Sequence, residues 1–224
     1  DLRGHGRSQG ERMLPRRFED YVSDLERFVA LVVKCVPGVP VFLLGYSLGG
    51  LIAALHTART RIHMKGLILV AGAFAPGAHF PPGLASTLFL LGIIFPRLPL
   101  PPLFGYRSFV SSHDNDQERD PDPLVYRGAL PAGFVTQFLR GMKLLRRSEL
   151  SGPAGVLVQH GGKDVLASPG GARRIAGESR VPDCTFREYP ELGHSLWLES
   201  EKDNLVSEML DWLDDRITGR GPND

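Results

Sequence analysis

The 224-residue sequence contains only two cysteines, and its opposite charges nearly cancel. Cys35 and Cys184 lie far apart and fit neither a disulfide framework nor the spacing of metal ligands, so we expect two buried thiols in a reducing compartment, as in a cytoplasmic protein. With 26 basic and 25 acidic residues, the chain has a formal net charge of +1. It therefore lacks the positive charge that would favour a nucleic-acid partner.

The sequence also lacks an apolar run long enough to cross a membrane. Its main run, residues 84–95, is shorter than the 20 or so residues that a spanning helix needs, and prolines lie on both sides of it. No His, Asp, Glu or Cys cluster has metal-ligand spacing, and no glycine-rich loop suits a nucleotide phosphate. We therefore expect neither a metal nor a cofactor.

One stretch, residues 41–50, organises the rest of the chain. Its apolar beginning predicts a buried parallel strand, Gly45-Tyr46-Ser47-Leu48-Gly49 follows at once, and a helical pattern continues from Leu51. A Gly-x-Ser-x-Gly motif between a strand and a helix is typical of a nucleophile elbow, a sharp turn that exposes its serine. We predict that Ser47 is a nucleophile; the alternative is a glycine-rich loop without chemistry.

Strand and helix patterns alternate through most of the sequence, which indicates an α/β fold with a mostly parallel sheet flanked by helices. Apolar runs predict three strands, residues 185–189 are expected to form a fourth, and three- and four-residue apolar spacing or composition predicts the helices between and after them. The predicted strands cover residues 41–45, 66–70, 155–159 and 185–189, and the predicted helices cover residues 18–34, 51–61, 169–176 and 205–213.

The middle of the chain has a different composition. Between residues 74 and 150 prolines are frequent and strand alternation is absent, which predicts a helical cap inserted between two core segments, residues 1–73 and 151–224. The apolar run at 84–95 suits a lid that touches a membrane surface and admits acyl chains. It equally suits a helix that packs on the cap's own core.

A serine hydroxyl becomes a good nucleophile only when a base removes its proton and a carboxylate orients that base. Ser47, Asp164 and His194 occur in the chain order that α/β-hydrolases use. Asp164 and His194 also follow predicted strands, where open parallel sheets form their sites. His160 is a rival base, but its place four residues before Asp164 suits it better to shaping that loop. The backbone N–H of Leu48 is expected to be one donor of an oxyanion hole.

Several segments together resemble the monoacylglycerol lipase and lysophospholipase branch of the serine α/β-hydrolases. They are Arg3-Gly4-His5-Gly6-Arg7-Ser8 with Gly10-Glu11-Arg12, residues 41–50, Asp122-Pro123-Leu124, Gly162-Lys163-Asp164 and Gly193-His194. The resemblance implies an eight-stranded sheet, with Ser47 as nucleophile, Asp164 as acid and His194 as base. It also implies that the first strands and the second oxyanion donor of the family are missing from these residues.

The expected activity is hydrolysis of one ester bond of a monoacylglycerol or lysophospholipid through an acyl-enzyme on Ser47, with transient membrane contact through the cap. A small-ester esterase is one alternative. Another is a peptidase of the proline-iminopeptidase type, with Asp114, Asp116 and Glu118 gripping a free amino terminus. The third is a catalytically impaired fragment, because loss of one oxyanion donor costs about 100- to 1000-fold in turnover.

Overall fold

The computed structural model describes residues 1–60, 62, 64–78, 80–101, 122–198 and 202–219. In this part of the chain four parallel strands form one sheet, and their spatial order is their order in the sequence. The strands are β1 (Phe42–Tyr46), β2 (Gly66–Val70), β3 (Val156–Gly161) and β4 (Cys184–Tyr189). The predicted α/β class is confirmed, with four strands in the described residues in place of the eight that the resemblance implied.

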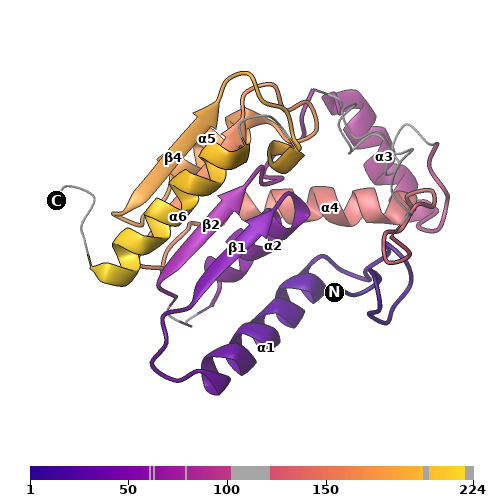
Figure 1. Cartoon of the computed structure of the whole chain (residues 1–224). Helices are drawn as coiled ribbons and strands as arrows, with labels where there is room; N and C mark the ends of the chain where they lie inside the picture. The colour runs from indigo at the N-terminus through magenta and orange to yellow at the C-terminus, as the bar shows by residue number, and fades with distance from the viewer. Residues whose placement is uncertain (61, 63, 79, 102–121, 199–201, 220–224) are drawn as a thin grey trace.

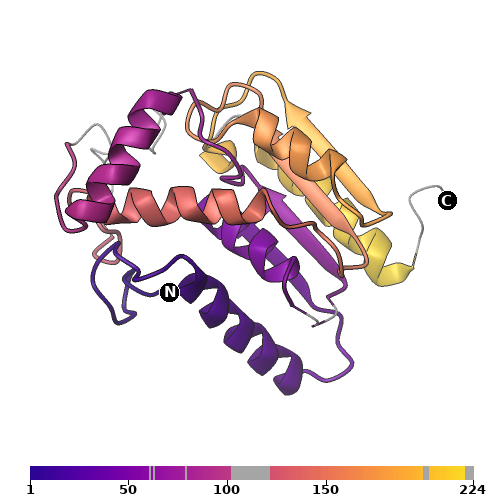
Figure 2. The same ribbon diagram turned by 180° about the vertical axis from the view of Figure 1, so that it is seen from behind.

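Helices cover both faces of the sheet (Figures 1 and 2). The inner strand β2 is buried throughout, so its alternating side chains enter two different cores. Leu67 and Leu69 pack on the side of α1, α2 and α5, whereas Ile68 and Val70 pack on the side of α6. These helices are α1 (Glu19–Cys35), α2 (Leu48–Thr57), α5 (Pro169–Gly177) and α6 (Lys202–Thr218).

Two further helices, α3 (Pro82–Ile94) and α4 (Ala132–Leu145), lie beyond the carboxyl ends of the strands (Figure 1). They pack closely because Gly92 of α3 meets the backbone of α4: a Cβ there would lie 2.2 Å from the carbonyl oxygen of Ala132. The other end of α4 belongs to the main core, where Met142 and Leu145 are buried. Helix α4 therefore joins the predicted cap region to the sheet.

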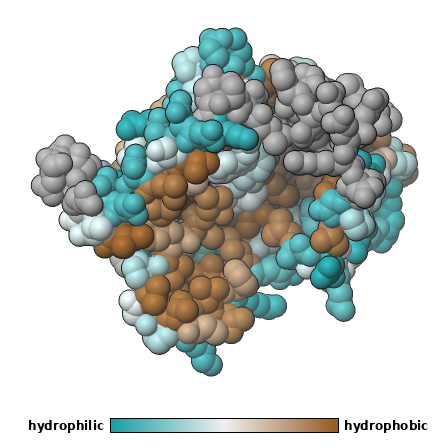
Figure 3. All heavy atoms as spheres, in the orientation of Figure 1, coloured by the Kyte–Doolittle hydropathy of each residue, from teal (hydrophilic) through white to brown (hydrophobic). Residues whose placement is uncertain are grey.

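The two edge strands of the described sheet, β1 and β4, differ in the side chains around them. On the β4 side, Glu188 of this strand pairs with Arg173 of α5. At β1, which has no second strand partner among the described residues, apolar side chains are exposed instead. Phe28 and Leu31 of the neighbouring α1 and Leu44 of β1 are among them, and Figure 3 shows apolar surface over this region. An unguarded edge of this kind can pair with further strands.

The expected burial of both cysteines is wrong. Cys35 is exposed because it is the last residue of α1, at the end that projects away from the core. Cys184, at the start of β4, is only partly buried.

No helix in the described ranges has the length and apolarity needed to cross a bilayer.

Glycine is required where β1 turns into α2. A Cβ on Gly45 would lie 2.5 Å from the carbonyl oxygen of Gly49, and one on Gly50 would lie 2.9 Å from the Cα of Gly72. Both contacts are with backbone, which cannot rotate away as a side chain can. The two positions let α2 begin directly against the sheet. Gly49 itself faces open space.

We predict opposite effects for alanine at Gly45 and Gly49. Gly45→Ala should lower the free energy of unfolding by about 2 kcal/mol or more because the new methyl group overlaps backbone. Gly49→Ala, the matched control, should leave stability unchanged or raise it by about 0.5 kcal/mol, since alanine favours a helix. Urea unfolding followed by circular dichroism measures both. Equal destabilisation by the two variants would contradict the packing argument.

Candidate active site

Ser47 occupies the turn between β1 and α2 in a backbone conformation that side-chain-bearing residues rarely adopt, with φ 51° and ψ −114°. The neighbouring backbone holds it there. Its N–H donates to the carbonyl oxygen of Val70 at 3.0 Å, and its own carbonyl oxygen accepts from the N–H groups of Leu51 at 3.2 Å and Ala73 at 3.1 Å. The strained turn lifts the hydroxyl above the sheet edge, as a nucleophile elbow does.

The three residues selected from the sequence lie in one chain of hydrogen bonds. Oγ of Ser47 is 2.9 Å from Nε2 of His194, and Nδ1 of His194 is 2.7 Å from Oδ2 of Asp164. Because the Asp164 carboxylate accepts at Nδ1, the ring keeps its hydrogen there, and Nε2 can accept the Ser47 proton. The fold brings together residues that are 147 and 30 positions apart in the sequence.

Asp164 is buried, yet its carboxylate is well supplied with donors. Oδ1 accepts the backbone N–H groups of Leu166 and Ala167, each at 2.9 Å. Burial by itself would raise the pKa of Asp164, but hydrogen bonds from His160 and His194 outweigh it and hold the pKa below its usual range. The group is therefore ionised at neutral pH and can stabilise a positive charge on His194.

Tyr46 contacts His194, and the sequence did not predict this contact. Its hydroxyl donates to the carbonyl oxygen of His194 at 3.1 Å, and its ring lies against the imidazole at 5.6 Å between centroids. Burial raises the pKa of Tyr46, so the hydroxyl remains a donor. Its partner is 148 residues away in the sequence, and no local sequence pattern predicts a contact over that separation.

Leu48 is the first residue of α2 and lies directly after Ser47. Backbone N–H groups in the first turn of a helix have no acceptor inside the helix. They also lie at the positive end of the helix dipole, which favours a negative charge nearby. The Leu48 N–H is thus placed where it can donate to an oxygen that becomes negative next to Ser47.

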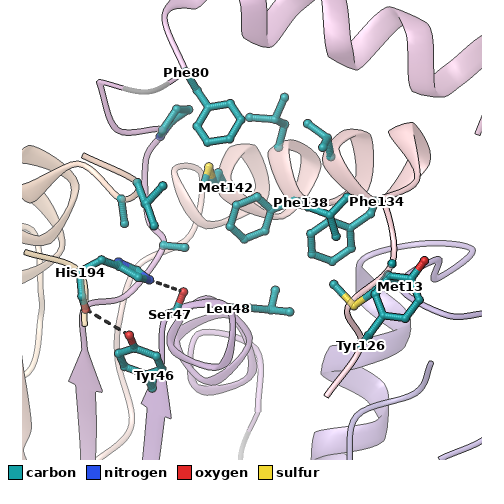
Figure 4. Close-up of a pocket in the computed structure, with 18 residues that line it drawn as sticks. Met13, Tyr46, Ser47, Leu48, Phe80, Tyr126, Phe134, Phe138, Met142 and His194 are labelled. Atoms are coloured by element: carbon teal, nitrogen blue, oxygen red, sulfur yellow. Dashed lines mark hydrogen bonds between the residues drawn. The ribbon is translucent and has the colours of Figure 1, made fainter. Parts of the chain in front are cut away.

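A cavity of about 260 Å³ opens beside Ser47 and His194 (Figure 4). Phe134, Phe138 and Met142 project into it from one face of α4. Apart from Ser47, His194 and the tyrosines, the described lining is apolar, and it includes no Asp, Glu, Lys or Arg. The lining residues are Met13, Tyr46, Ser47, Leu48, Ala73, Pro76, Phe80, Tyr126, Gly128, Leu130, Phe134, Val135, Phe138, Leu139, Met142, Leu166, Ala167 and His194.

The sequence analysis recognised helical character in this region without identifying the wall of the cavity. The four-residue spacing of Phe134, Phe138 and Met142 was the available signal, because such residues share one helix face. Met13 had no signal of this kind, since it lies in the N-terminal loop. Among the described residues no group of three or more His, Cys, Asp or Glu side chains lies together as a metal site would require.

Comparisons with known proteins agree on the family and the fold. The family model described as serine aminopeptidase, S33, matches residues 1–201. The chain is 31% identical to the monoglyceride lipase of Rattus norvegicus and 30% identical to that of Mus musculus, in each case over 97% of this chain and 73% of the relative. The monoacylglycerol lipase of Mycolicibacterium smegmatis is 28% identical over 95% of this chain and 76% of the relative.

Solved structures show the same fold at lower sequence identity. The monoacylglycerol lipase of Paleococcus ferrophilus matches with a TM-score of 0.75 and 22% identity, over 96% of this chain and 82% of that one. A soluble variant of the monoglyceride lipase of Saccharomyces cerevisiae, in complex with a substrate analogue, matches with a TM-score of 0.73 and 22% identity. That match covers 96% of this chain and 76% of the other.

The hydrogen-bonded chain predicts how Ser47 reacts with a fluorophosphonate. Labelling should occur at Ser47 and disappear in Ser47→Ala. Asp164→Asn should slow it by about 10⁴-fold because an amide favours the wrong imidazole tautomer. Peptide mass spectrometry locates the adduct and measures its rate.

Asp183→Asn is the matched control for the acidic position. Asp183 pairs with Arg216, away from the cavity, so its loss should affect stability without slowing the labelling of folded protein. Equal labelling of Asp164→Asn and wild type would contradict the role of Asp164.

Proposed function

The chain belongs to the serine aminopeptidase S33 family, and from this premise we propose that it is a serine hydrolase that cleaves the ester bond of monoacylglycerols through an acyl-enzyme on Ser47. The observation that carries the proposal is that the Ser47, His194 and Asp164 hydrogen-bond chain ends at an apolar cavity. Such a cavity suits an acyl chain, and the chain of hydrogen bonds suits acyl transfer.

The proposed reaction has two halves. Ser47 Oγ attacks the ester carbonyl while Nε2 of His194 takes its proton, and the Leu48 N–H donates to the oxyanion that forms. His194 then protonates the glycerol oxygen as the C–O bond breaks, which leaves the acyl group on Ser47. In the second half, His194 removes a proton from water, the resulting hydroxide attacks the acyl carbonyl, and the fatty acid leaves as Ser47 recovers its proton.

The described cavity favours an ester of a fatty acid over a peptide. A free amino terminus calls for an acidic side chain in the binding site, and no described lining residue is acidic. The acidic residues considered for that purpose, Asp114, Asp116 and Glu118, lie outside the described residues. Lysophospholipids offer the same acyl ester with a different head group, so we include them as a second substrate class at this site.

Substrate preference tests the proposal. Wild type should hydrolyse mono-oleoylglycerol faster than lysophosphatidylcholine and much faster than an aminoacyl amide, and Ser47→Ala should hydrolyse none of them.

Phe138→Asp should raise KM for mono-oleoylglycerol by about tenfold or more, because a charge in the apolar wall opposes the acyl chain. It should leave turnover of p-nitrophenyl acetate nearly unchanged, since that ester has no long chain.

Lys143→Asp is the control on the same helix, where the native side chain is exposed outside the cavity. It should leave the KM for mono-oleoylglycerol unchanged.

Faster cleavage of the aminoacyl amide would favour the peptidase alternative, and cleavage of p-nitrophenyl acetate alone would favour a small-ester esterase. A labelled Ser47 without measurable turnover of any of these compounds would favour the impaired fragment.

We further propose that residues 74–150 act as a cap that touches the membrane surface from which the substrate comes. Helix α3 packs its Leu88 and Gly92 inward. On other sides it exposes Leu90 and Ile94, with 59% and 66% of each residue accessible to solvent. Exposed apolar side chains at the end of a helix can enter the interface of a bilayer without crossing it.

The double variant Leu90→Glu with Ile94→Glu should reduce co-sedimentation with phosphatidylcholine vesicles by about tenfold or more, because two apolar side chains no longer enter the lipid. Hydrolysis of p-nitrophenyl acetate should not change. Leu210→Glu, a comparably exposed leucine on α6, is the control and should bind vesicles like wild type. If the control and the double variant bind alike, α3 is not the contact surface.

A further inference from the structure

His160 lies in β3, four residues before Asp164, and its side chain is completely buried. Its Nε2 is 3.1 Å from the carbonyl oxygen of Ala167 and 3.2 Å from Oδ2 of Asp164. Both oxygens are acceptors, because Asp164 is ionised, so Nε2 must carry a hydrogen. The imidazole therefore connects β3 to both ends of the loop from Asp164 to Ala167.

The other ring nitrogen of His160 is in a different position. Nδ1 is buried and has no hydrogen-bond partner within the part of the chain that the structure describes. A second proton there would be a buried donor without an acceptor, which is costly. The contacts of His160 thus favour a hydrogen on Nε2 alone, whereas His194 has a partner at both of its ring nitrogens.

The two histidines share one oxygen. Oδ2 of Asp164 receives Nδ1–H of His194 at 2.7 Å and has Nε2–H of His160 at 3.2 Å, while Oδ1 receives two backbone N–H groups. With donors on both oxygens, the carboxylate cannot rotate without losing contacts. Among the interactions that lower the pKa of Asp164 against the effect of burial, the His160 hydrogen bond is the largest.

We propose that His160 is a positioning residue: its Nε2–H donates to Asp164 and to the Ala167 carbonyl, and so holds the carboxylate in the orientation that directs His194 toward Ser47. This inference rests on the proposed serine hydrolase function and extends it to a residue that does not line the cavity. His160 also shares Oδ2 of Asp164 with His194, so the two donors compete for the charge on that oxygen.

The pH dependence of the reaction reports on this second effect. Without the His160 donor, Oδ2 attracts a proton on His194 more strongly, so the neutral base would appear only at higher pH. Substitution of His160 leaves the other ionisable groups near the two histidines in place, and among them only Glu188, whose pKa is lowered by its Arg173 hydrogen bond and to a smaller degree by His160, responds to the change. These groups are Tyr46 against His194, Glu188 opposite His160 on β4 with its partner Arg173, and the exposed pair Lys163 and Glu191 on the adjoining loops.

Three variants separate positioning from packing. The amide nitrogen of glutamine in His160→Gln reaches the place of Nε2, that of asparagine in His160→Asn reaches only the place of Nδ1, and leucine in His160→Leu fills space without donating. The readout is the rate of fluorophosphonate labelling at Ser47 from pH 5 to pH 9, which does not depend on the natural ester. Circular dichroism confirms which variants are folded.

We expect His160→Gln to label within about threefold of wild type, with the same acid limb of the pH profile. Labelling of His160→Asn and His160→Leu should fall by about 10- to 100-fold, and the acid limb should move to higher pH. Wild-type labelling in His160→Leu, or an equal loss in all three variants without a shift of the acid limb, would overturn the proposal. So would failure of His160→Gln to fold, since His160 would then serve the core.

The same experiment distinguishes this inference from the proposed function. If wild type labels at Ser47 but does not hydrolyse mono-oleoylglycerol, the proposed substrate is wrong and the three variants still test His160. If wild type is folded and does not label at Ser47, the hydrogen-bonded chain does not activate the serine. The proposed function and the role of His160 then fail together.

Discussion

The turn at Ser47 is the constraint on which the rest of the site depends. Its positive φ is maintained by hydrogen bonds to β2 and to Ala73, and the close approach of Gly45 to Gly49 lets α2 begin within one residue of β1. One strained turn therefore positions two groups, the Ser47 hydroxyl and the Leu48 N–H at the helix start. The cost of the strain is met by the backbone packing around it.

The charge on Asp164 is the second physical constraint on the site. Burial raises the pKa of the Asp164 carboxyl, but hydrogen bonds from two histidines and from backbone N–H groups together lower it by more and keep the group ionised. Only His194 of the two histidines has a hydrogen-bond partner at both ring nitrogens, because Nδ1 of His160 has none in the described chain. The cavity beside Ser47 and His194 is lined mainly by apolar side chains, so the hydrogen bond between these two residues borders an apolar surface.

Helix α4 connects the substrate wall to the core. Its Phe134 and Phe138 rings are stacked 5.8 Å apart beside the cavity, while Leu145 at its other end is fully buried against the sheet layer. The sequence predicted helices in this region from proline content and missing strand alternation. It did not reveal that the face with Phe134, Phe138 and Met142 borders the serine, because that contact depends on how α4 packs on the core.

By itself the sequence determined the α/β class, the strand at residues 66–70 and the turn that carries Ser47, because apolar periodicity and glycine spacing are local properties. Only the tertiary structure decided which residues far apart in the sequence contact one another. It joined His194 to Ser47 over 147 residues, placed Tyr46 under His194, and exposed Cys35 against expectation. Such contacts depend on strand order and helix packing, which no local pattern encodes.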